Sequence, residues 1–280
     1  MIVNKNAYAA LVFCATLWST ALVAQDNTGT NPVNFTYDFR VYSELAQLDN
    51  DAGSSALTTA ELRVPLGRDI AYLSDDPTES PFYDMGSRWQ LRFRAKYKNL
   101  SLENPLNPPF DASEVSGIGD FDARLLWIAS ASKKMVLAAG LEVFMDTASN
   151  DALGNGQTVL GPTAFAVFPG LLGPGSLFAP GYQYVVDAGG GNGQSDISRS
   201  QIDLYLVWGL ADGRNWLIID PQVIIDHEAN DDVFATLEVE WGYMMVPESG
   251  ISAYFRPGIG LGSDKLYDWN FEIGLKFVWR

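Results

Sequence analysis

Basic residues alternate with apolar ones along residues 86–98, and this spacing is the clearest chemical signal in the sequence. Successive side chains of an extended strand point to opposite faces, so the basic residues share one face and Trp, Leu, Phe, Ala and Tyr share the other. A single Arg or Lys facing lipid at mid-bilayer costs about 2–4 kcal/mol, so this face must look into a polar interior. The basic set is Arg88, Arg92, Arg94, Lys96 and Lys98.

Acidic residues on other predicted strands complete a candidate polar interior. Asp120, Asp122 and Glu142 fall on the next two strands, where they can form ion pairs with the basic row and with Glu61 and Arg63 beside it. Two interpretations stay open: a transverse field across a narrow pore that orients a polar or charged solute, or an interior closed by ion pairs. The candidate lining residues are Arg88, Arg92, Arg94, Lys96, Asp120, Asp122, Glu142, Asp220, Glu238, Glu240, Arg256 and Glu272.

Hydrolytic chemistry has one candidate residue. A serine or aspartate hydrolase needs a histidine as its general base, and His227 is the only histidine. It falls at the predicted outer end of a strand, between Asp226 and Glu228, and no serine or threonine can be tied to it from the sequence. A surface histidine in a polar loop is therefore favoured over a catalytic one, and no catalytic, cofactor-binding or metal-binding residue is predicted.

The elements that must position these residues are strands of about the length that a tilted membrane-spanning strand requires. The C-terminal strand is the clearest example, because six apolar or aromatic residues between Trp269 and Trp279 alternate with polar ones. An even number of such strands is typical of a closed bacterial barrel. Twelve strands are predicted near residues 34–46, 56–66, 86–98, 119–129, 134–146, 158–169, 177–187, 197–210, 214–226, 233–246, 249–261 and 267–279.

The connections between these strands alternate in length, as expected for short periplasmic turns and longer outer loops. The segment 67–86 is the exception, because its position in the count predicts a turn and yet it is long and acidic. The fold class is therefore all-β: a transmembrane antiparallel up-and-down β-barrel of about 12 strands. A soluble β-sandwich also has many short strands, but it does not explain why the apolar faces of the strands have aromatic residues at both ends.

The N-terminus has the pattern of a secretory signal, with Lys5, an apolar stretch from Ala7 to Trp18, and small residues at Ala21 and Ala24. This predicts a signal peptide over 1–24 and the barrel over 25–280. An inner-membrane anchor is the alternative, which the short and interrupted apolar stretch disfavours. Cleavage would remove Cys14 and leave no cysteine, and a net charge of −16 excludes wrapping of nucleic acid.

Several short segments, one with a proline and the others with glycines, resemble an outer-membrane family described as MetA-pathway phenol-degradation proteins or putative transporters. A Met-Asp-Thr at 145–147 departs from the Pro-Thr-Gly usual there. The local physical explanation is that Gly117 and Gly119 allow a tight start of a strand, whereas Gly154 and Gly156 suit a positive φ in a loop. The similar segments are Leu62–Leu66, Gly117–Phe121, Leu153–Gly156 and Leu160–Pro162.

The resemblance implies a cell-surface barrel linked to uptake of aromatic or other hydrophobic compounds. The predicted function is an outer-membrane channel for passive uptake of small solutes, and the alternative is a non-conducting structural or surface-binding barrel. The expected partners are outer-membrane lipid and lipopolysaccharide, a small-molecule solute, and the barrel-assembly machinery through the C-terminal strand.

Overall fold

The computed structural model describes residues 30–33, 35–66, 88–102, 113–132, 134–188, 195–210, 213–263 and 265–279. The predicted signal peptide, Cys14, the segment 67–86 and the glycine run at 189–193 lie outside the described residues. The strands are β1 (Tyr37–Leu48), β2 (Gly53–Leu66), β3 (Trp89–Leu102), β4 (Ser113–Ile118), β5 (Phe121–Ala131), β6 (Val136–Met145), β7 (Val159–Pro169), β8 (Ser176–Asp187), β9 (Ser198–Gly209), β10 (Asn215–Asp226), β11 (Asp232–Val246), β12 (Ile251–Leu261) and β13 (Tyr267–Trp279).

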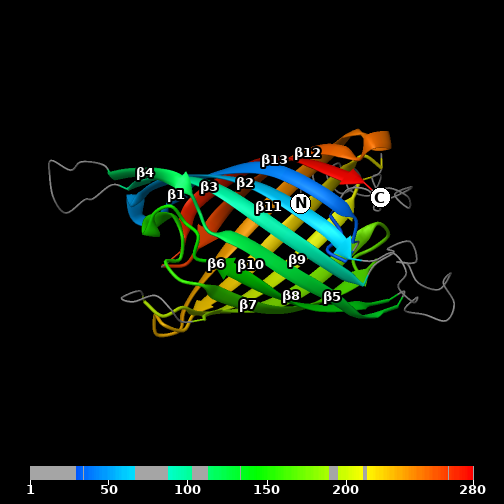
Figure 1. Cartoon of the computed structure of the whole chain (residues 1–280). Coiled ribbons are helices and arrows are strands. Elements are labelled where there is room, and N and C mark those ends of the chain that lie inside the picture. Colours follow the sequence, from blue (N-terminus) through cyan, green and yellow to red (C-terminus); the bar gives the residue numbers. More distant parts are fainter. Residues whose placement is uncertain are drawn as a thin grey trace, which may run out of the picture.

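These strands form one closed antiparallel barrel (Figure 1), which confirms the predicted fold class. Consecutive strands pair with one another, β1 pairs with β13, and β2 pairs with β3, so the sheet has no open edge at either seam. Closure satisfies the backbone groups that an open sheet would leave unpaired.

The described residues form thirteen strands where twelve were predicted, because the fourth predicted strand is preceded by an extra short one. β3 pairs with β4 along its last part and with β5 along its first part, so β4 and β5 together occupy one position in the wall. The break between them falls at Gly119 and Asp120, which lie outside both strands.

The two ends of the barrel differ. We call one the tight-turn end, because the connections between β5 and β6, β7 and β8, β9 and β10, and β11 and β12 lie there together with the start of β1 and the end of β13. The opposite rim is the loop end, and among the described residues its connections include two short 3₁₀ turns, Asp49–Asp51 and Asp151–Leu153. A third 3₁₀ turn, Pro247–Ser249, belongs to the tight-turn end.

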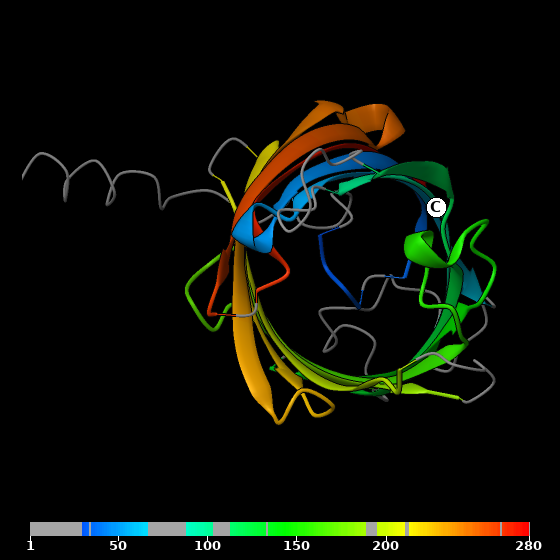
Figure 2. The same ribbon diagram turned by 90° about the vertical axis from the view of Figure 1, so that its left-hand side faces the viewer.

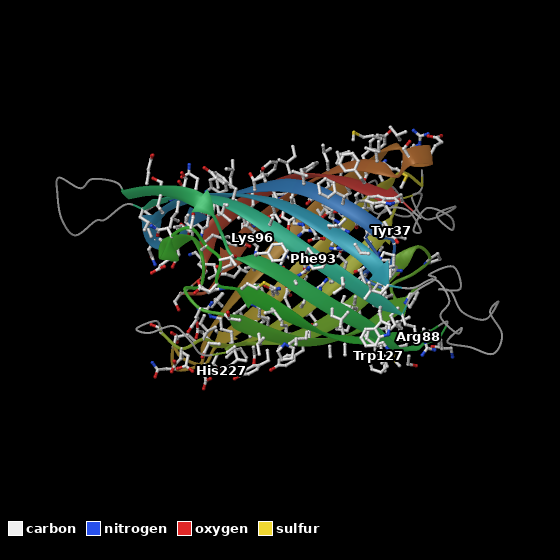
Figure 3. The ribbon with its side chains drawn as sticks, in the orientation of Figure 1. Tyr37, Arg88, Phe93, Lys96, Trp127 and His227 are labelled. Carbon is white, nitrogen blue, oxygen red and sulfur yellow. The ribbon has the colours of Figure 1, made fainter. Side chains whose placement is uncertain are left out.

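Side chains alternate between the outer and inner faces along each strand, as the sequence pattern predicts. On β3, Trp89 and Tyr97 are exposed on the outside, whereas Gln90 and Arg92 are buried within the barrel. On β13, Trp269, Ile273 and Leu275 are exposed on the outside. The outer surface is therefore apolar and aromatic, and the polar side chains are directed inward (Figure 3). No helix in the described part of the chain is long and apolar enough to cross a membrane.

Candidate functional site

The basic row of β3 is neutralised by acids on the adjacent strands. Arg94 Nε donates to Asp122 Oδ1 at 2.8 Å, and Lys96 Nζ lies 2.7 Å from Asp122 Oδ2. Glu142 on β6 accepts from Arg94 Nη2 at 2.7 Å and also pairs with Arg92. Asp122 and Glu142 are buried, so this part of the wall is an ion-pair network with both signs present, not a bare cationic surface.

A second group of ion pairs on β1 and β2 continues this network. Arg63 Nε donates to Glu61 Oε1 at 2.5 Å, and Arg40 Nε lies 3.7 Å from the same carboxylate oxygen. Arg40 also pairs with Asp38, its neighbour two residues away on the same face. Three strands therefore present arginines to the interior, each with a carboxylate beside it.

On β10 to β13, which continue the wall from β1, Glu240 is the centre of a third network. Its carboxylate accepts from Trp216 Nε1 at 2.7 Å, from Lys276 Nζ at 2.8 Å and from Arg256 Nη2 at 2.6 Å. Lys276 also lies over the rings of Trp216 and Tyr254, with its Nζ 5.1 and 4.4 Å from their centroids. Glu240 is fully buried, and every contact made by its carboxylate is with a cation or an N–H donor.

The remaining acids of that wall are held by neutral donors and by Arg256. Tyr254 Oη donates to Glu272 Oε1 at 2.7 Å. Asn270 Nδ2 donates to Glu238 Oε1 at 2.6 Å, and Arg256 Nη1 lies 3.3 Å from Glu238 Oε2. These acids bind partners on β12 and β13, whereas the basic row of β3 pairs with Asp122 and Glu142.

A cavity of about 280 Å³ lies between these networks inside the barrel. Arginines from β1, β2, β3, β5 and β12 line it, and two carboxylates from β9 and β10 line it from the other side. Glutamines on β8, β9 and β10, together with Phe165 and Tyr205, complete the walls. The charged residues are Arg40, Arg63, Arg92, Arg124, Arg256, Asp203 and Asp220.

The tight-turn end of the interior is apolar and is filled by the first described residues. Val33 is fully buried and Phe35 is 2% exposed, and both belong to one cluster with inward-facing side chains of β5 to β12. Figure 2 shows this dark blue segment running inside the ring of strands. We call residues 30–33 and 35–36 the inner segment. The first strand is predicted from near residue 34, whereas β1 begins at Tyr37 and residues 35–36 are buried inside the barrel.

The inner segment also forms part of the cavity wall, because Thr30 and Pro32 line the cavity beside Arg40 and Arg63. The cavity therefore has a charged wall formed by the strands and a floor formed by the inner segment, with the apolar cluster beneath it. The inner segment thus contributes to both the cavity wall and the apolar cluster at the tight-turn end of the barrel.

Asp120 does not line the interior with the other predicted residues. It lies at the break between β4 and β5, and its carboxylate accepts from the backbone N–H groups of Thr147 and Ala148 at 3.2 Å each and of Asn155 at 2.6 Å. Gly154 has a φ of −138°, so its expected positive φ is wrong, whereas Gly156 has a φ of 66°. A Cβ on Gly154 would lie 2.5 Å from Asp120 Oδ1, so the close approach of this carboxylate requires glycine.

Replacing Asp120 with Ala is expected to loosen the loop 147–155 without opening the barrel. Hydrogen bonds to a charged group contribute about 1.5–3 kcal/mol each, and three are lost together. Hydrogen exchange measured by mass spectrometry should show faster exchange at Ala148 and Asn155, with a smaller effect for Asp120→Asn. Asp151→Asn is the matched control in the same loop, and an equal effect of both substitutions at position 120 and of this control would contradict the assignment.

His227 has partners that the sequence could not reveal. Its Nε2 lies 2.9 Å from Ser200 Oγ, and its Nδ1 lies 2.6 Å from Asp231 Oδ1. This is the order of groups in a serine hydrolase triad. Figure 3 shows His227 at the rim of the loop end. The structure thus associates Ser200 with this histidine, which the sequence alone could not do.

Two features separate this trio from a hydrolase site. Ser200 is 7% exposed, and its hydroxyl also bonds Tyr182 Oη at 2.9 Å. Ser200 pairs with Tyr184 on one side and with Ile225 on the other, so the surrounding backbone belongs to the sheet ladder. A tetrahedral intermediate needs donors aimed at its oxyanion, and the described residues around Ser200 supply no such pair.

The trio is therefore expected to be inert towards serine-directed reagents. A fluorophosphonate probe added to the folded barrel should leave Ser200 unmodified by mass spectrometry, and Ser200→Ala and His227→Ala should behave as the unsubstituted protein in phospholipase and protease assays. Labelling of Ser200 that disappears in His227→Ala would instead establish a catalytic serine.

The described residues contain no group of three or more His, Cys, Asp or Glu side chains that could hold a metal ion. In the acidic turn at residues 49–51, Asp49 is 3.1 Å from Lys265 Nζ, and Asp268 lies 3.0 Å from the same ammonium. These hydrogen bonds, first from Asp268 and then from Asp49, raise the pKa of Lys265 above its ordinary value. Asp49 thus joins the turn to the start of β13.

Sequence reasoning missed several interior residues that line the cavity or hold its walls. Arg124 falls two residues after Asp122, and Asp203 alternates with Gln201 and Tyr205, so the same period of two contained both. The polar face of their strands is harder to recognise in the sequence, because each strand also has inward apolar residues towards the tight-turn end. The missed charged residues are Asp38, Arg40, Arg124, Asp203 and Lys276.

Solved structures with the same architecture are bacterial outer-membrane barrels. An outer-membrane channel from Pseudomonas putida F1 is 14% identical, with a TM-score of 0.61 over 89% of this chain and 97% of that one. The NanC porin is 12% identical, with a TM-score of 0.56 over 86% of this chain and 98% of its own. The β domain of the Bordetella autotransporter BrkA is 12% identical, with a TM-score of 0.51 over 87% and 99% of the two chains.

At these identities the likeness concerns the fold. The fold and the interior together define the class: a closed antiparallel β-barrel of the outer-membrane type, with an apolar outer surface and a polar, charged interior. No protein-family model and no curated protein matches the sequence. Two of the three barrels described above are a porin and a channel.

Proposed function

We propose that this protein is an outer-membrane channel through which small solutes move passively. The observation that carries the proposal is the cavity inside the closed wall, lined by arginines on one side and by Asp203 and Asp220 on the other. Opposed charges across a confined space produce a field that attracts and orients polar or charged solutes.

The outer surface supports a membrane location. Tyr37 stacks on Trp279 and Trp89 on Trp127, each with centroids 5.8 Å apart, towards the tight-turn end (Figure 3). Trp269 lies near the start of β13, towards the loop end. Aromatic residues at both ends of an apolar band fit two membrane interfaces. Within this proposal, residues 1–24 are the secretory signal. The bilayer and lipopolysaccharide surround the barrel, and the barrel-assembly machinery recognises β13.

The resemblance to the phenol-degradation family favours hydrophobic or aromatic compounds among the solutes. The polar cavity walls, with Phe165 and Tyr205 beside the charges, fit a small molecule that has both an apolar body and polar groups. The alternative function, a barrel that does not conduct, is favoured by one observation: the inner segment lines the cavity and packs into the apolar cluster at the tight-turn end.

Planar bilayers decide between these two functions. A conducting barrel should insert with discrete current steps, whereas a barrel that shows no current and no solute flux at any voltage would refute the channel. Selectivity gives a second measurement, because Arg124→Glu replaces an arginine that has no carboxylate within 4.0 Å among the described residues. The reversal potential in a salt gradient should shift towards cations. The same substitution at Arg88, which does not line the cavity, should shift it less.

A further inference from the structure

The cavity brings together buried polar atoms that have no hydrogen-bond partner among the described residues. On its cationic side these include the Nε atoms of Arg92 and Arg124, and on its acidic side the Oδ1 atoms of Asp203 and Asp220. A buried polar atom without a partner costs about 1–3 kcal/mol. The Nε of Arg256, which also lines the cavity, is a further donor of this kind. Apart from it, these donors without acceptors and acceptors without donors come from different parts of the wall around one small space.

Arg124 is the least compensated charge of this cavity. Arg40, Arg63, Arg92 and Arg256 each have a carboxylate within 4.0 Å, and no such pair involves Arg124 in the described part of the chain. Its register partner on β6 is Glu142, but that carboxylate already binds Arg92, Arg94 and Gln183. Its register partner on β3 is Arg92, another cation.

Like charges placed opposite one another in a sheet are unfavourable, and an anion between them removes the repulsion. A planar carboxylate matches the two parallel donors of a guanidinium, so Arg124 with Arg92 and Arg63 nearby is suited to an organic carboxylate. The cationic side alone would accept any small anion.

The acidic side restricts that choice. Asp203 on β9 and Asp220 on β10 face the same cavity and would repel the negative end of a second anion. They can accept hydrogen bonds from an ammonium or hydroxyl group of a ligand. Arg256 also lines the cavity, but its guanidinium is held by Glu238 and Glu240 at 3.3 and 2.6 Å.

We propose that the cavity is a binding site for a small organic acid that carries a carboxylate at one end and a donor group, ammonium or hydroxyl, at the other. Arg124 binds the carboxylate, Asp203 and Asp220 bind the donor group, and Phe165 and Tyr205 contact the apolar body between them. A volume near 280 Å³ admits one molecule of single-ring size. The proposal deepens the proposed function, because it names the solute class that the channel would hold.

Three probes of similar size test it on the detergent-solubilised barrel by calorimetry: 4-(aminomethyl)benzoate, benzoate and benzylamine. The first carries both charged groups and should bind about 10- to 100-fold more tightly than either of the others, since each lost charged hydrogen bond weakens binding by that order. Equal or tighter binding of benzoate, or absence of binding by the first probe, would overturn the proposal.

Substitutions assign the two ends of the ligand. Arg124→Gln should weaken both carboxylate probes, whereas Asp203→Asn with Asp220→Asn should weaken 4-(aminomethyl)benzoate and leave benzoate as tight or tighter. Arg88→Gln is the matched control, an arginine outside the cavity, and heat-modifiability on gels verifies that each variant is folded. An effect of Arg124→Gln no larger than that of Arg88→Gln would refute the role of Arg124.

Planar-bilayer measurements keep this inference separate from the proposed function. Conductance without binding of the probe would refute the binding site and leave the channel standing. Binding of the probe without conductance would do the reverse.

Discussion

Replacing Val33 and Phe35 together with Asp is expected to raise the single-channel conductance of the barrel severalfold. Both side chains lie in the apolar cluster at the tight-turn end, with exposed fractions of 0% and 2%. A carboxylate in an apolar environment without a partner is far less stable than one in water. Because the inner segment lies outside the strands that form the wall, every strand can keep its ladder when the segment leaves the interior.

The control is the pair Val33→Leu and Phe35→Leu, which keeps apolar side chains in the cluster and should leave the conductance nearly unchanged. A second readout follows the segment itself. With Cys14 removed and Thr30 replaced by Cys, maleimide labelling should be slow in the otherwise unchanged chain, since Thr30 is 3% exposed, and fast in the Asp variant. Fast labelling with an unchanged conductance would show that the inner segment moves but does not limit the current.

The wall of the barrel could be predicted from the sequence because the outer surface imposes one rule on every strand. Apolar residues must occupy every second position, so the strands and their facing follow from a period of two. β4 was not predicted, because this strand of six residues at the loop end contains Ser, Glu and Gly and has no continuous apolar face.

The interior could be predicted only in part because it obeys no such single rule. Towards the tight-turn end of β5 and β10, runs such as Leu125–Ile128 and Trp216–Ile219 are apolar on both faces, and a period of two then gives no warning of what the inner face contacts. Residues apolar on both faces indicate burial on both sides. In the structure, the inner segment packs against this inner face together with inward side chains of neighbouring strands.

The ion-pair partners within the interior could not be predicted from the sequence, for a different reason. Ten of the twelve candidates lie in strands of the barrel, and Arg88 and Asp120 do not. Which acid neutralises which base depends on the register between strands and on the depth of each residue. Asp120 shows the limit, because it follows the same alternation as Asp122 and yet turns towards the loop 147–155. The two-residue break between β4 and β5 decides this, and no sequence period encodes it.

Replacing Glu240 with Leu is expected to be the most destabilising single substitution that we consider, at about 3–5 kcal/mol of the unfolding free energy. Its carboxylate joins Trp216 on β10, Arg256 on β12 and Lys276 on β13, so one side chain links three strands other than its own. Lys276 is 2% exposed and would remain as a buried ammonium with no other carboxylate within 4.0 Å among the described residues. Urea unfolding of the reconstituted barrel, followed by tryptophan fluorescence, measures the loss.

The double variant Glu240→Leu with Lys276→Met distinguishes two causes of destabilisation. One is the loss of the hydrogen bonds and ion pairs of Glu240, and the other is the buried ammonium of Lys276 without a carboxylate. Arg256 keeps Glu238 at 3.3 Å in that variant, so no buried cation is left alone, and the Met side chain can still contact the rings of Trp216 and Tyr254. It should recover a large part of the stability lost by Glu240→Leu. Glu248→Gln, in the exposed turn after β11, is the control and should change little. If the double variant is less stable than Glu240→Leu, the network stabilises the barrel through Lys276 itself, and the unpaired ammonium is not the cause of the loss.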